Sequence, residues 1–453
     1  MQDIVANQRA FFNTHSSKDL SFRITQLKKL EKLLKSCQSQ LDGAIYADFK
    51  KSPFENFATE IAMLLIDITE AKRHLHRWAK QKKVKTNLAN FPASSYIIPE
   101  PLGVCLVIGA WNYPYLITLS PVIAAIAAGN TVVIKPSEIS SESSKVIAKL
   151  INSNFDPAYL KVVEGGIPET TALLVQKFDK IFFTGSSTVG KIVYQAAAEH
   201  LTPVTLELGG KSPAIIASDA NLKMTVKRLI WAKFLNAGQT CIAPDYVLVD
   251  EKVKDKFLAL AVEAIAKAKY DIDNDNYTQI INDRNLNRLS ALMPKDKVYY
   301  GGEIDTAART IAPTILTEID FTSEIMQEEI FGPILPVIGY TNVDNAIAEV
   351  QRLPKPLSCY TFTSSTKFKK KVLNELSFGG GTINDAVMHI SNPNLPFGGV
   401  GASGMGSYHG EDGFKTFSHY KSILDKPTWF ELPLKYAPYS KMKLAWLRRV
   451  IGL

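Results

Sequence analysis

The distribution of apolar and polar residues predicts helices at the N-terminus, followed by alternating strands and helices. Between residues 17 and 50, Leu27, Leu30, Leu33 and Leu34 fall on one face of a lysine-rich segment, which predicts a helix. The stretch SSYIIPEPLG that begins at Ser94 contains two prolines, which exclude a helix. This stretch is predicted to be extended and to lead into the first sheet.

Residues 102 to 134 are almost all apolar, as in a membrane span. Prolines, an asparagine and the pair Gly129-Asn130 interrupt the run, and the remaining pieces are too short to cross a bilayer as one helix. A strand–helix–strand unit fits better: GVCLVI is a strand, Ser120 an N-cap, Pro121 the first residue of the helix, and TVVI the next strand. Strands that are apolar on both faces are typical of a parallel sheet covered by helices.

The alternation continues to the strand KIFFTG, which runs directly into the loop FFTGSSTVGK at residues 182 to 191. A helix is predicted to follow in GKIVYQAAAEH. The loop has the spacing of a triphosphate-binding P-loop, G-x-x-x-x-G-K-[ST], but Ile192 stands where that motif has its metal-binding hydroxyl. Its position between a strand and a helix favours a dinucleotide phosphate site. A triphosphate loop and a surface turn remain as alternatives.

Composition narrows the classes of function. The 453 residues are 46% apolar and 21% charged, as in a globular protein of roughly two to four domains. Of the net charge of +8, six charges belong to residues 415 to 453, with eight Lys/Arg against two Asp/Glu. The rest of the chain is nearly balanced, so no binding to nucleic acid is expected. The first residues, MQDIVANQRAFF, lack a secretory pattern, and a cytoplasmic location is expected.

Glu207 is the first candidate for chemistry. It stands between two leucines in TPVTLELGGKSPAII, beside Gly209-Gly210. A carboxylate at the end of an apolar strand is either a salt-bridged structural residue or a base with a raised pKa. The glycines permit close approach of another chain segment, which favours a site.

Cys241 is the second candidate, in the connection FLNAGQTCIAPDYVLV between a predicted helix and a predicted strand. Its small and polar neighbours suggest an accessible thiol, and hence a nucleophile. The cysteines contain no C-x-x-C pair, so neither a disulfide framework nor a metal site is expected. The other three are interpreted as inert core residues: Cys37, Cys105 and Cys359.

The histidines offer no clear partner for a cysteine protease, although His389 and His409 lie in loop-rich sequence. A cysteine, a carboxylate and a dinucleotide loop indicate different chemistry. The thiol could add to an aldehyde, the adduct could lose a hydride, and a base could deliver water to the thioester that results.

Seven motifs resemble, in order, those of the aldehyde dehydrogenase superfamily and span nearly the whole chain. They are WNYP at 111–114, KPSE at 135–138, FTGSSTVG at 183–190, ELGGK at 207–211, GQTC at 238–241, EEIFGP at 328–333 and PFGG at 396–399. The short N-terminus, GAWNYP and FKTFSHYKS are similar to the class 3 branch, which includes fatty and aromatic aldehyde dehydrogenases. That branch forms dimers and accepts NAD, NADP or both, so a homodimer and either cofactor are expected, with medium- to long-chain aliphatic or aromatic aldehydes as substrates.

The resemblance implies a role for each matching residue. Cys241 would be the nucleophile, Asn112 the amide that holds the oxyanion together with the Cys241 N–H, and Glu207 the general base. Around the cofactor, the matching positions are Lys135 and Glu138 (adenine ribose), Gly185 and Ser186 (pyrophosphate), Gly190 (close packing of the following helix), Glu329 (nicotinamide ribose) and Phe331 (packing nearby). Lys191 is expected to be incidental, and no metal is expected.

The fold implied is α/β, with a Rossmann-like parallel-sheet NAD(P)-binding domain, an α/β catalytic domain and a small β oligomerisation element. The predicted bounds are 1–85 and 101–206 for the first, 207–405 for the second, and 86–100 and 406–435 for the third. Residues 436–453 are predicted to form a basic amphipathic tail, with Leu444, Leu447, Val450 and Ile451 on one face. Peripheral contact with an anionic membrane is one interpretation of the tail, and docking on a partner subunit or a frayed end is the other.

Three other functions are weighed against this one. An acylating dehydrogenase that passes the acyl group to coenzyme A generally lacks an acid at the position of Glu207. A P-loop ATPase or kinase is opposed by Ile192. A non-catalytic crystallin-like relative is disfavoured because Cys241, Glu207 and Asn112 occur together.

Overall fold

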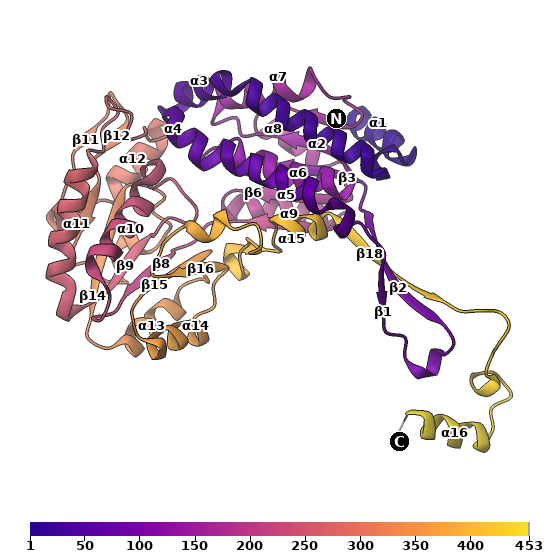
Figure 1. The fold of residues 1–453 in the computed structure, drawn as a ribbon. Helices are drawn as coiled ribbons and strands as arrows, with labels where there is room; N and C mark the ends of the chain where they lie inside the picture. Colours follow the sequence, from indigo (N-terminus) through magenta and orange to yellow (C-terminus); the bar gives the residue numbers. More distant parts are fainter. Residues whose placement is uncertain (452–453) are drawn as a thin grey trace.

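The fold consists of two large sheets flanked by helices and a small sheet that projects from them (Figure 1). The computed structural model describes residues 1–451, and their side chains as far as Arg449. Parallel strands alternate with helices in both large sheets, so the predicted α/β class is confirmed.

The first large sheet has six strands in the order β17-β7-β6-β3-β4-β5. All its neighbouring strands are parallel except β17, which is antiparallel to β7. The chain leaves β3 towards β4 and β5 and returns on the other side as β6 and β7, so the strand order reverses between β3 and β6. The bounds are β3 Val104–Ile108, β4 Thr131–Lys135, β5 Leu160–Val162, β6 Lys180–Thr184, β7 Val204–Glu207 and β17 Gly404–Met405.

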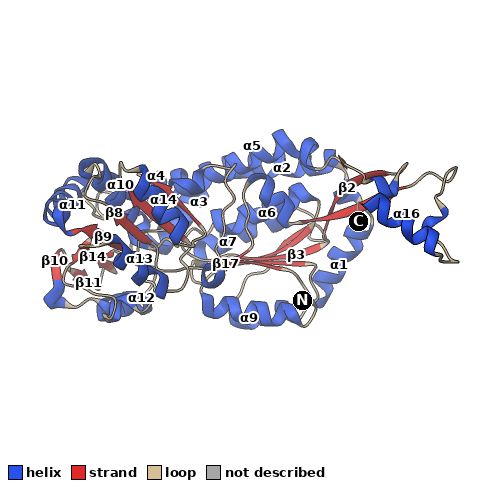
Figure 2. Ribbon diagram, turned by 90° about the horizontal axis from the view of Figure 1, so that it is seen from below, coloured by secondary structure: helices blue, strands red, loops and turns tan. Residues whose placement is uncertain are grey.

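Helices cover both faces of this sheet (Figure 2), which explains why β3 and β4 are buried at every position. One face carries α2 (Leu20–Ser36), α5 (Ala62–Trp78), α6 (Leu116–Ala128) and α7 (Ser141–Asn152), and the other carries α1 (Gln2–Asn13) and α9 (Ser187–Ala198). The helix α8 (Ile167–Leu174) precedes β6. The helix predicted over residues 17–50 is present, but it is divided at Cys37 into α2 and α3 (Gln38–Phe49).

The start of α6 differs from the prediction. The helix begins at Leu116, so Pro121 lies inside it and Ser120 is not its N-cap. The cap is the buried carboxylate of Glu60, whose Oε2 accepts the N–H groups of Tyr115 (2.8 Å) and Leu116 (3.1 Å). The hydroxyl of Ser120 donates instead to another carboxylate, that of Asp67, at 2.5 Å. Among the described residues, no helix combines the length and the apolar character needed to cross a bilayer.

The second large sheet has seven strands in the order β10-β13-β14-β9-β8-β15-β16, and only the β10–β13 pair is antiparallel. Its strands are β8 Pro213–Ile216, β9 Tyr246–Asp250, β10 Val298–Tyr300, β13 Thr314–Leu316, β14 Ile334–Tyr340, β15 Ser358–Phe362 and β16 Gly380–Ile383. Its helices are α10 Leu222–Phe234, α11 Lys254–Ala268, α12 Asp283–Leu292, α13 Val343–Arg352 and α14 Thr366–Glu375. The chain passes from the first sheet to the second between Glu207 and Pro213.

A three-stranded antiparallel sheet, β1-β2-β18, projects away from the two large sheets (Figure 1). It consists of β1 Lys82–Val84, β2 Ser94–Pro101 and β18 Ser418–Asp425. The stretch SSYIIPEPLG therefore is extended, as predicted, but it pairs in this separate sheet. Within the range predicted for oligomerisation, α15 (Gly410–Thr416) packs on α5 and α6 instead. The tail contains the helix α16 (Lys441–Ile451), although the side chains of Val450 and Ile451 lie outside the described residues.

Candidate active site

A cavity of about 310 Å³ contains both Cys241 and Glu207 in its wall. Its lining comes from the ends of β6 and β7, from α5, α6 and α10, and from loops of both halves of the chain, and most of that lining is apolar or aromatic. Trp231, Phe397 and Tyr408 contribute rings to it. No sequence pattern marks these three aromatics as a group, because they come from distant segments and meet only in the folded chain.

Glu207 ends β7 and is almost completely buried, with 3% of its surface exposed. Neither of its carboxylate oxygens accepts a hydrogen bond from the described residues, and none of their cations pairs with it. Burial raises the pKa of Glu207 well above the ordinary value for a glutamate. Of the two predicted alternatives, the salt-bridged structural role therefore finds no support, and the geometry fits a carboxylic acid with a raised pKa.

Cys241 is half-buried, whereas its neighbours Gln239 and Thr240 are buried. The thiol is accessible, as its neighbours suggested, although Gln239 and Thr240 themselves face inward and it is the cavity that opens onto Cys241. Burial raises the pKa of the Cys241 thiol to about 12, and the carboxyl groups of Glu329 and Glu207 add to the rise. The thiol is therefore protonated near neutral pH in the protein alone.

The other cysteines differ in their surroundings. Cys105 and Cys359 are buried, as predicted for core residues. Cys37 is only half-buried and lies at the junction of α2 and α3, so its interpretation as a core residue was only partly right.

The segment before Cys241 has an unusual backbone. Asn236 and Ala237 have φ values of 53° and 50°, and Gly238 follows with a φ of 71°. Left-handed φ is costly for residues other than glycine, and here buried hydrogen bonds offset the cost. The Asn236 amide donates to the carbonyl oxygens of Asn112 and Gln239, both at 3.0 Å.

Asn112 lies in the loop between β3 and α6, beside the point where the strand order of the first sheet reverses. It is buried, and its Nδ2 donates to the carbonyl oxygen of Gln239 at 3.1 Å. The loop after β3 is thus bonded directly to the loop that carries Cys241. An amide nitrogen has two hydrogens, so Asn112 keeps one N–H for a further acceptor.

Lys135 and Glu138 lie at the carboxyl end of β4. The Lys135 ammonium is buried, donates to the Pro136 carbonyl at 2.7 Å and lies 3.5 Å from the Glu138 carboxylate, which is half-exposed. Burial lowers the pKa of Lys135, and the Glu138 charge opposes that change. A half-exposed carboxylate with one unpaired oxygen suits ribose hydroxyls, and the adjacent cation could accept a 2′-phosphate.

The loop after β6 forms the N-terminus of α9, where Ser186 is the N-cap and its hydroxyl accepts the N–H of Val189 at 3.4 Å. Gly190 lies inside α9, where a Cβ would come within 2.7 Å of Leu208 Cδ2, so the helix packs closely there and a side chain would have to displace Leu208. Lys191 and Ile192 are exposed, and nothing at their position resembles a metal-binding triphosphate loop.

Glu329 lies against Gly209, in the connection between β7 and β8, where a Cβ would lie 1.8 Å from the Glu329 Oε2. Burial, followed by the nearby Asp245 carboxylate, raises the pKa of Glu329 to about 8. Phe331 has a φ of 50°, and its ring meets that of Trp111 edge-on at 5.4 Å.

Two residues that hold the Glu329 segment were not predicted from the sequence. The ammonium of Lys211 pairs with the buried Asp245 and donates to the carbonyl oxygen of Glu328 at 2.8 Å. Asp245 also accepts the N–H of Ile330 at 2.9 Å. A lysine within the apolar stretch ELGGKSPAII is the sequence signal that could have indicated a buried ion pair at Lys211.

These residues fit a dinucleotide better than a metal or a protease pair. The helix N-terminus at Ser186 suits a pyrophosphate, and Glu138 and Glu329 offer carboxylates to two riboses. No group of His, Cys, Asp and Glu within the described chain could hold a metal ion. Burial lowers the pKa of His389 and of His409 to about 4, and neither ring lines the cavity of Cys241.

Comparison with known proteins identifies relatives over the full length. The sequence profile of the aldehyde dehydrogenase family matches residues 1–423. The chain is 49% identical to the 4,4'-diaponeurosporen-aldehyde dehydrogenase of Staphylococcus aureus, over 96% of this chain and 95% of that protein. It is 44% identical to mouse aldehyde dehydrogenase family 3 member A2, over 99% of this chain and 93% of that protein.

The solved structures agree with the sequence matches. The substrate-bound state of Staphylococcus aureus AldH superposes with a TM-score of 0.97, at 47% identity and with 99% of each chain covered. The resemblance to class 3 enzymes and the expected fold are therefore confirmed.

Proposed function

Because this chain belongs to the aldehyde dehydrogenase family, we propose that its substrates are apolar aldehydes and that Cys241 is the nucleophile that attacks them. The reaction itself follows from family membership: the enzyme oxidises an aldehyde to the carboxylic acid with NAD or NADP. The proposals on the substrate and on the nucleophile rest on one observation, the apolar cavity that contains Cys241 and Glu207 together.

Cys241 attacks the carbonyl carbon of the aldehyde, and the carbonyl oxygen gains negative charge as the thiohemiacetal forms. The free N–H of Asn112 and the backbone N–H of Cys241 stabilise that oxygen. Loss of one such donor typically slows a reaction by about two to three orders of magnitude. Because the pKa of the thiol is raised, its proton leaves the sulfur as the C–S bond forms. The carbonyl oxygen takes up this proton to give the neutral thiohemiacetal, and the proton is released again when the hydride departs.

The residues at the carboxyl ends of β4 and β6 hold the dinucleotide, with Lys135 and Glu138 at the adenine ribose and Ser186 at the pyrophosphate. Glu329 binds the second ribose, and Phe331 packs nearby. When bound, the oxidised nicotinamide supplies the acceptor for the hydride that converts the thiohemiacetal to a thioester.

Glu207 then completes the reaction. It removes a proton from the water that attacks the thioester, which releases the acid and restores the thiol. Burial raises the pKa of its unpaired carboxyl group, which makes the ionised form a stronger base. The same residue argues against the acylating alternative, in which coenzyme A and not water accepts the acyl group.

The apolar lining supports medium- to long-chain aliphatic or aromatic aldehydes as substrates. The relative from Staphylococcus aureus is named for 4,4'-diaponeurosporen-aldehyde. The test is the appearance of reduced cofactor with aldehydes from acetaldehyde to hexadecanal and with benzaldehyde, each with NAD and with NADP. Rates that fall with chain length would contradict the substrate class, and no reduction by folded, reduced protein would refute the activity.

The assembly proposed is a homodimer formed through the projecting sheet β1-β2-β18. Its edge strand β1 is exposed at every position, and exposed edge strands pair readily with another chain. Tyr420 and Leu424 on β18 are exposed apolar residues that a partner could cover. The location proposed is cytoplasmic, with peripheral membrane contact through residues 436–453.

A further inference from the structure

A buried ion pair lies outside the residues assigned to catalysis. The ammonium of Lys51 is 2.9 Å from Glu60 Oε1, and both side chains are fully buried. Buried ion pairs are costly to desolvate and often contribute little to stability. This pair therefore calls for a reason beyond holding the fold together.

Glu60 holds the segment that follows Asn112. It lies on a π-helical turn, Phe57–Ile61, between α4 (Pro53–Asn56) and α5, and such turns often mark functional positions. Its second oxygen accepts the N–H groups of Tyr115 and Leu116 at 2.8 and 3.1 Å. One carboxylate thus joins Lys51 to the start of α6.

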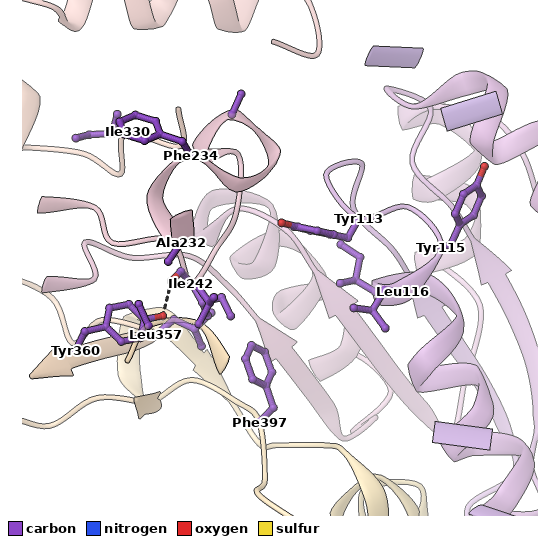
Figure 3. Packing of buried hydrophobic residues seen from close by; sticks show 14 of the residues in the cluster. Tyr113, Tyr115, Leu116, Ala232, Phe234, Ile242, Ile330, Leu357, Tyr360 and Phe397 are labelled. Atoms are coloured by element: carbon purple, nitrogen blue, oxygen red, sulfur yellow. Dashed lines mark hydrogen bonds between the residues drawn. The ribbon is translucent and has the colours of Figure 1, made fainter. Parts of the chain in front are cut away.

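Lys51 acts on the same segment through Tyr113. Its ammonium lies 3.9 Å from the centre of the Tyr113 ring, a short cation–π contact. The Tyr113 hydroxyl is 2.6 Å from the hydroxyl of Thr240, the residue before Cys241. Figure 3 shows Tyr113 extending towards the segment that contains Ile242, whereas Tyr115 points in another direction.

The same stretch of chain also holds the loop of Cys241 directly. Glu55 Oε1 accepts the N–H of Asn236 at 2.8 Å, at the start of the left-handed segment. Residues 51 to 60 therefore contact both loops: the one with Asn112 and the one with Cys241. Between these contacts lies the hydrogen bond from Asn112 to Gln239.

We propose that the Lys51–Glu60 ion pair is a positioning element that fixes the Asn112 amide relative to the sulfur of Cys241. This role rests on the proposed functions of Asn112 and Cys241. The pair does not touch the substrate; it sets the geometry in which the oxyanion is held. Small displacements in such geometry are enough to slow a reaction about a hundredfold.

The test compares Glu60→Gln, Lys51→Met and the double variant with the unmodified enzyme at saturating cofactor. We expect kcat to fall about tenfold to a hundredfold in each single variant, with KM for the aldehyde and the Kd for NAD changed less than about threefold. Because the two residues act as a unit, the double variant should be no slower than the slower single variant.

Arg9→Met provides the matched control. It removes a partly buried ion pair with Asp179 that lies on the face of the first sheet carrying α1, away from the cavity. We expect it to lower Tm while kcat stays the same. A fall in kcat proportional to the loss of Tm in all variants would overturn the positioning role.

Tyr113→Phe keeps the test decisive if the charge variants fail to fold. It removes the hydroxyl that contacts Thr240 and keeps the ring in the cavity wall, and kcat should fall in the same direction by a smaller factor. An unchanged kcat in Tyr113→Phe, or in folded Glu60→Gln, would overturn the positioning role of the ion pair but not the proposed function. An unmodified enzyme that oxidises no aldehyde would overturn the proposed function with it.

Discussion

Two carboxyl groups near Cys241 are kept in surroundings that favour their uncharged form. Burial raises the pKa of Glu207 well above its usual value and that of Glu329 to about 8. Glu329 is therefore largely protonated near neutral pH in the protein alone. The burial of Glu207 in the wall of the apolar cavity likewise favours its uncharged form.

Glu207→Gln should separate the two halves of the reaction. The amide keeps the shape of the side chain but cannot accept a proton from water, so the thioester should accumulate. We expect a rapid burst of reduced cofactor, close to one per active site, and then turnover slowed about a hundredfold or more. Stopped-flow absorbance measures both phases, and an unchanged steady-state rate would rule out the role of base.

The thiol of Cys241 should show its raised pKa directly. With a pKa of about 12 instead of 9.0, the fraction of thiolate should still rise about tenfold per pH unit up to about pH 10. Alkylation of the cofactor-free enzyme by iodoacetamide, followed by mass spectrometry of the peptide that contains Cys241, should show no plateau in that range. Cys241→Ala identifies the signal, and a plateau below about pH 9 would contradict the prediction.

Gly209→Ala should weaken the binding of cofactor. A Cβ at this position would lie 1.8 Å from Glu329 Oε2, so the carboxyl group must move away from its predicted place at the ribose. We expect the KM for NAD or NADP to rise about tenfold while the burst amplitude with saturating cofactor is kept. Gly43→Ala is the control, because nothing lies within 4 Å of a Cβ there; an equal KM in both variants would contradict the role of Glu329.

The sequence identified residues whose local pattern is unusual and missed those that act from a distance. Glu207 between leucines and Cys241 in a polar loop stand out by their immediate neighbours in the chain. Lys51 and Glu60 do not, because a lysine and a glutamate in an N-terminal segment normally face solvent. Only the folded chain brings them under Tyr113 and α6.

At the scale of elements, the caps of helices explain both a success and an error. The N-terminus of α9 was expected near the loop after β6, and Ser186 caps it locally. The start of α6 was predicted wrongly because its cap is Glu60, more than fifty residues earlier in the chain. Local patterns cannot reveal a cap that tertiary folding supplies.

Ser186→Ala should cost stability and cofactor affinity together. Loss of an N-cap hydroxyl costs about 1 kcal/mol, which should lower Tm by a few degrees. If Ser186 also contacts the pyrophosphate, the Kd for NAD should rise several-fold. Ser365→Ala is the control, because it removes the cap of α14, where the Ser365 hydroxyl accepts the N–H of Phe368 at 3.2 Å. It should lower Tm without changing the Kd for NAD. If Ser186→Ala and Ser365→Ala have the same Kd for NAD, Ser186 does not contact the cofactor.

At the scale of the whole molecule, the tail extends beyond the projecting sheet (Figure 1). On α16, Met442, Leu444 and Trp446 are at least half-exposed, and Arg448 and Arg449 carry positive charge. We expect a larger fraction of the full chain than of a chain of residues 1 to 436 to sediment with vesicles of phosphatidylserine. This difference should become smaller at high salt, because salt screens the positive charges of the tail. Equal sedimentation would exclude membrane contact by the tail.

The same truncation tests the assembly. If the dimer forms through β1-β2-β18, the protein should remain a dimer after residues 437–453 are removed. Analytical ultracentrifugation measures this as a mass equal to two truncated chains. A monomer after truncation would place the tail, and not the sheet, at the interface.

The antiparallel pairing of β17 with β7 has a consequence for synthesis of the chain. Gly404 pairs with Glu207 itself and Met405 with Leu206, so the edge strand that ends in Glu207 is completed by residues made nearly last. On the ribosome, β3 to β7 emerge and can fold while that edge is still unpaired, and open edges invite association between nascent chains. Premature termination anywhere in the second sheet would therefore leave a dinucleotide-binding half with an open edge and an incomplete active site.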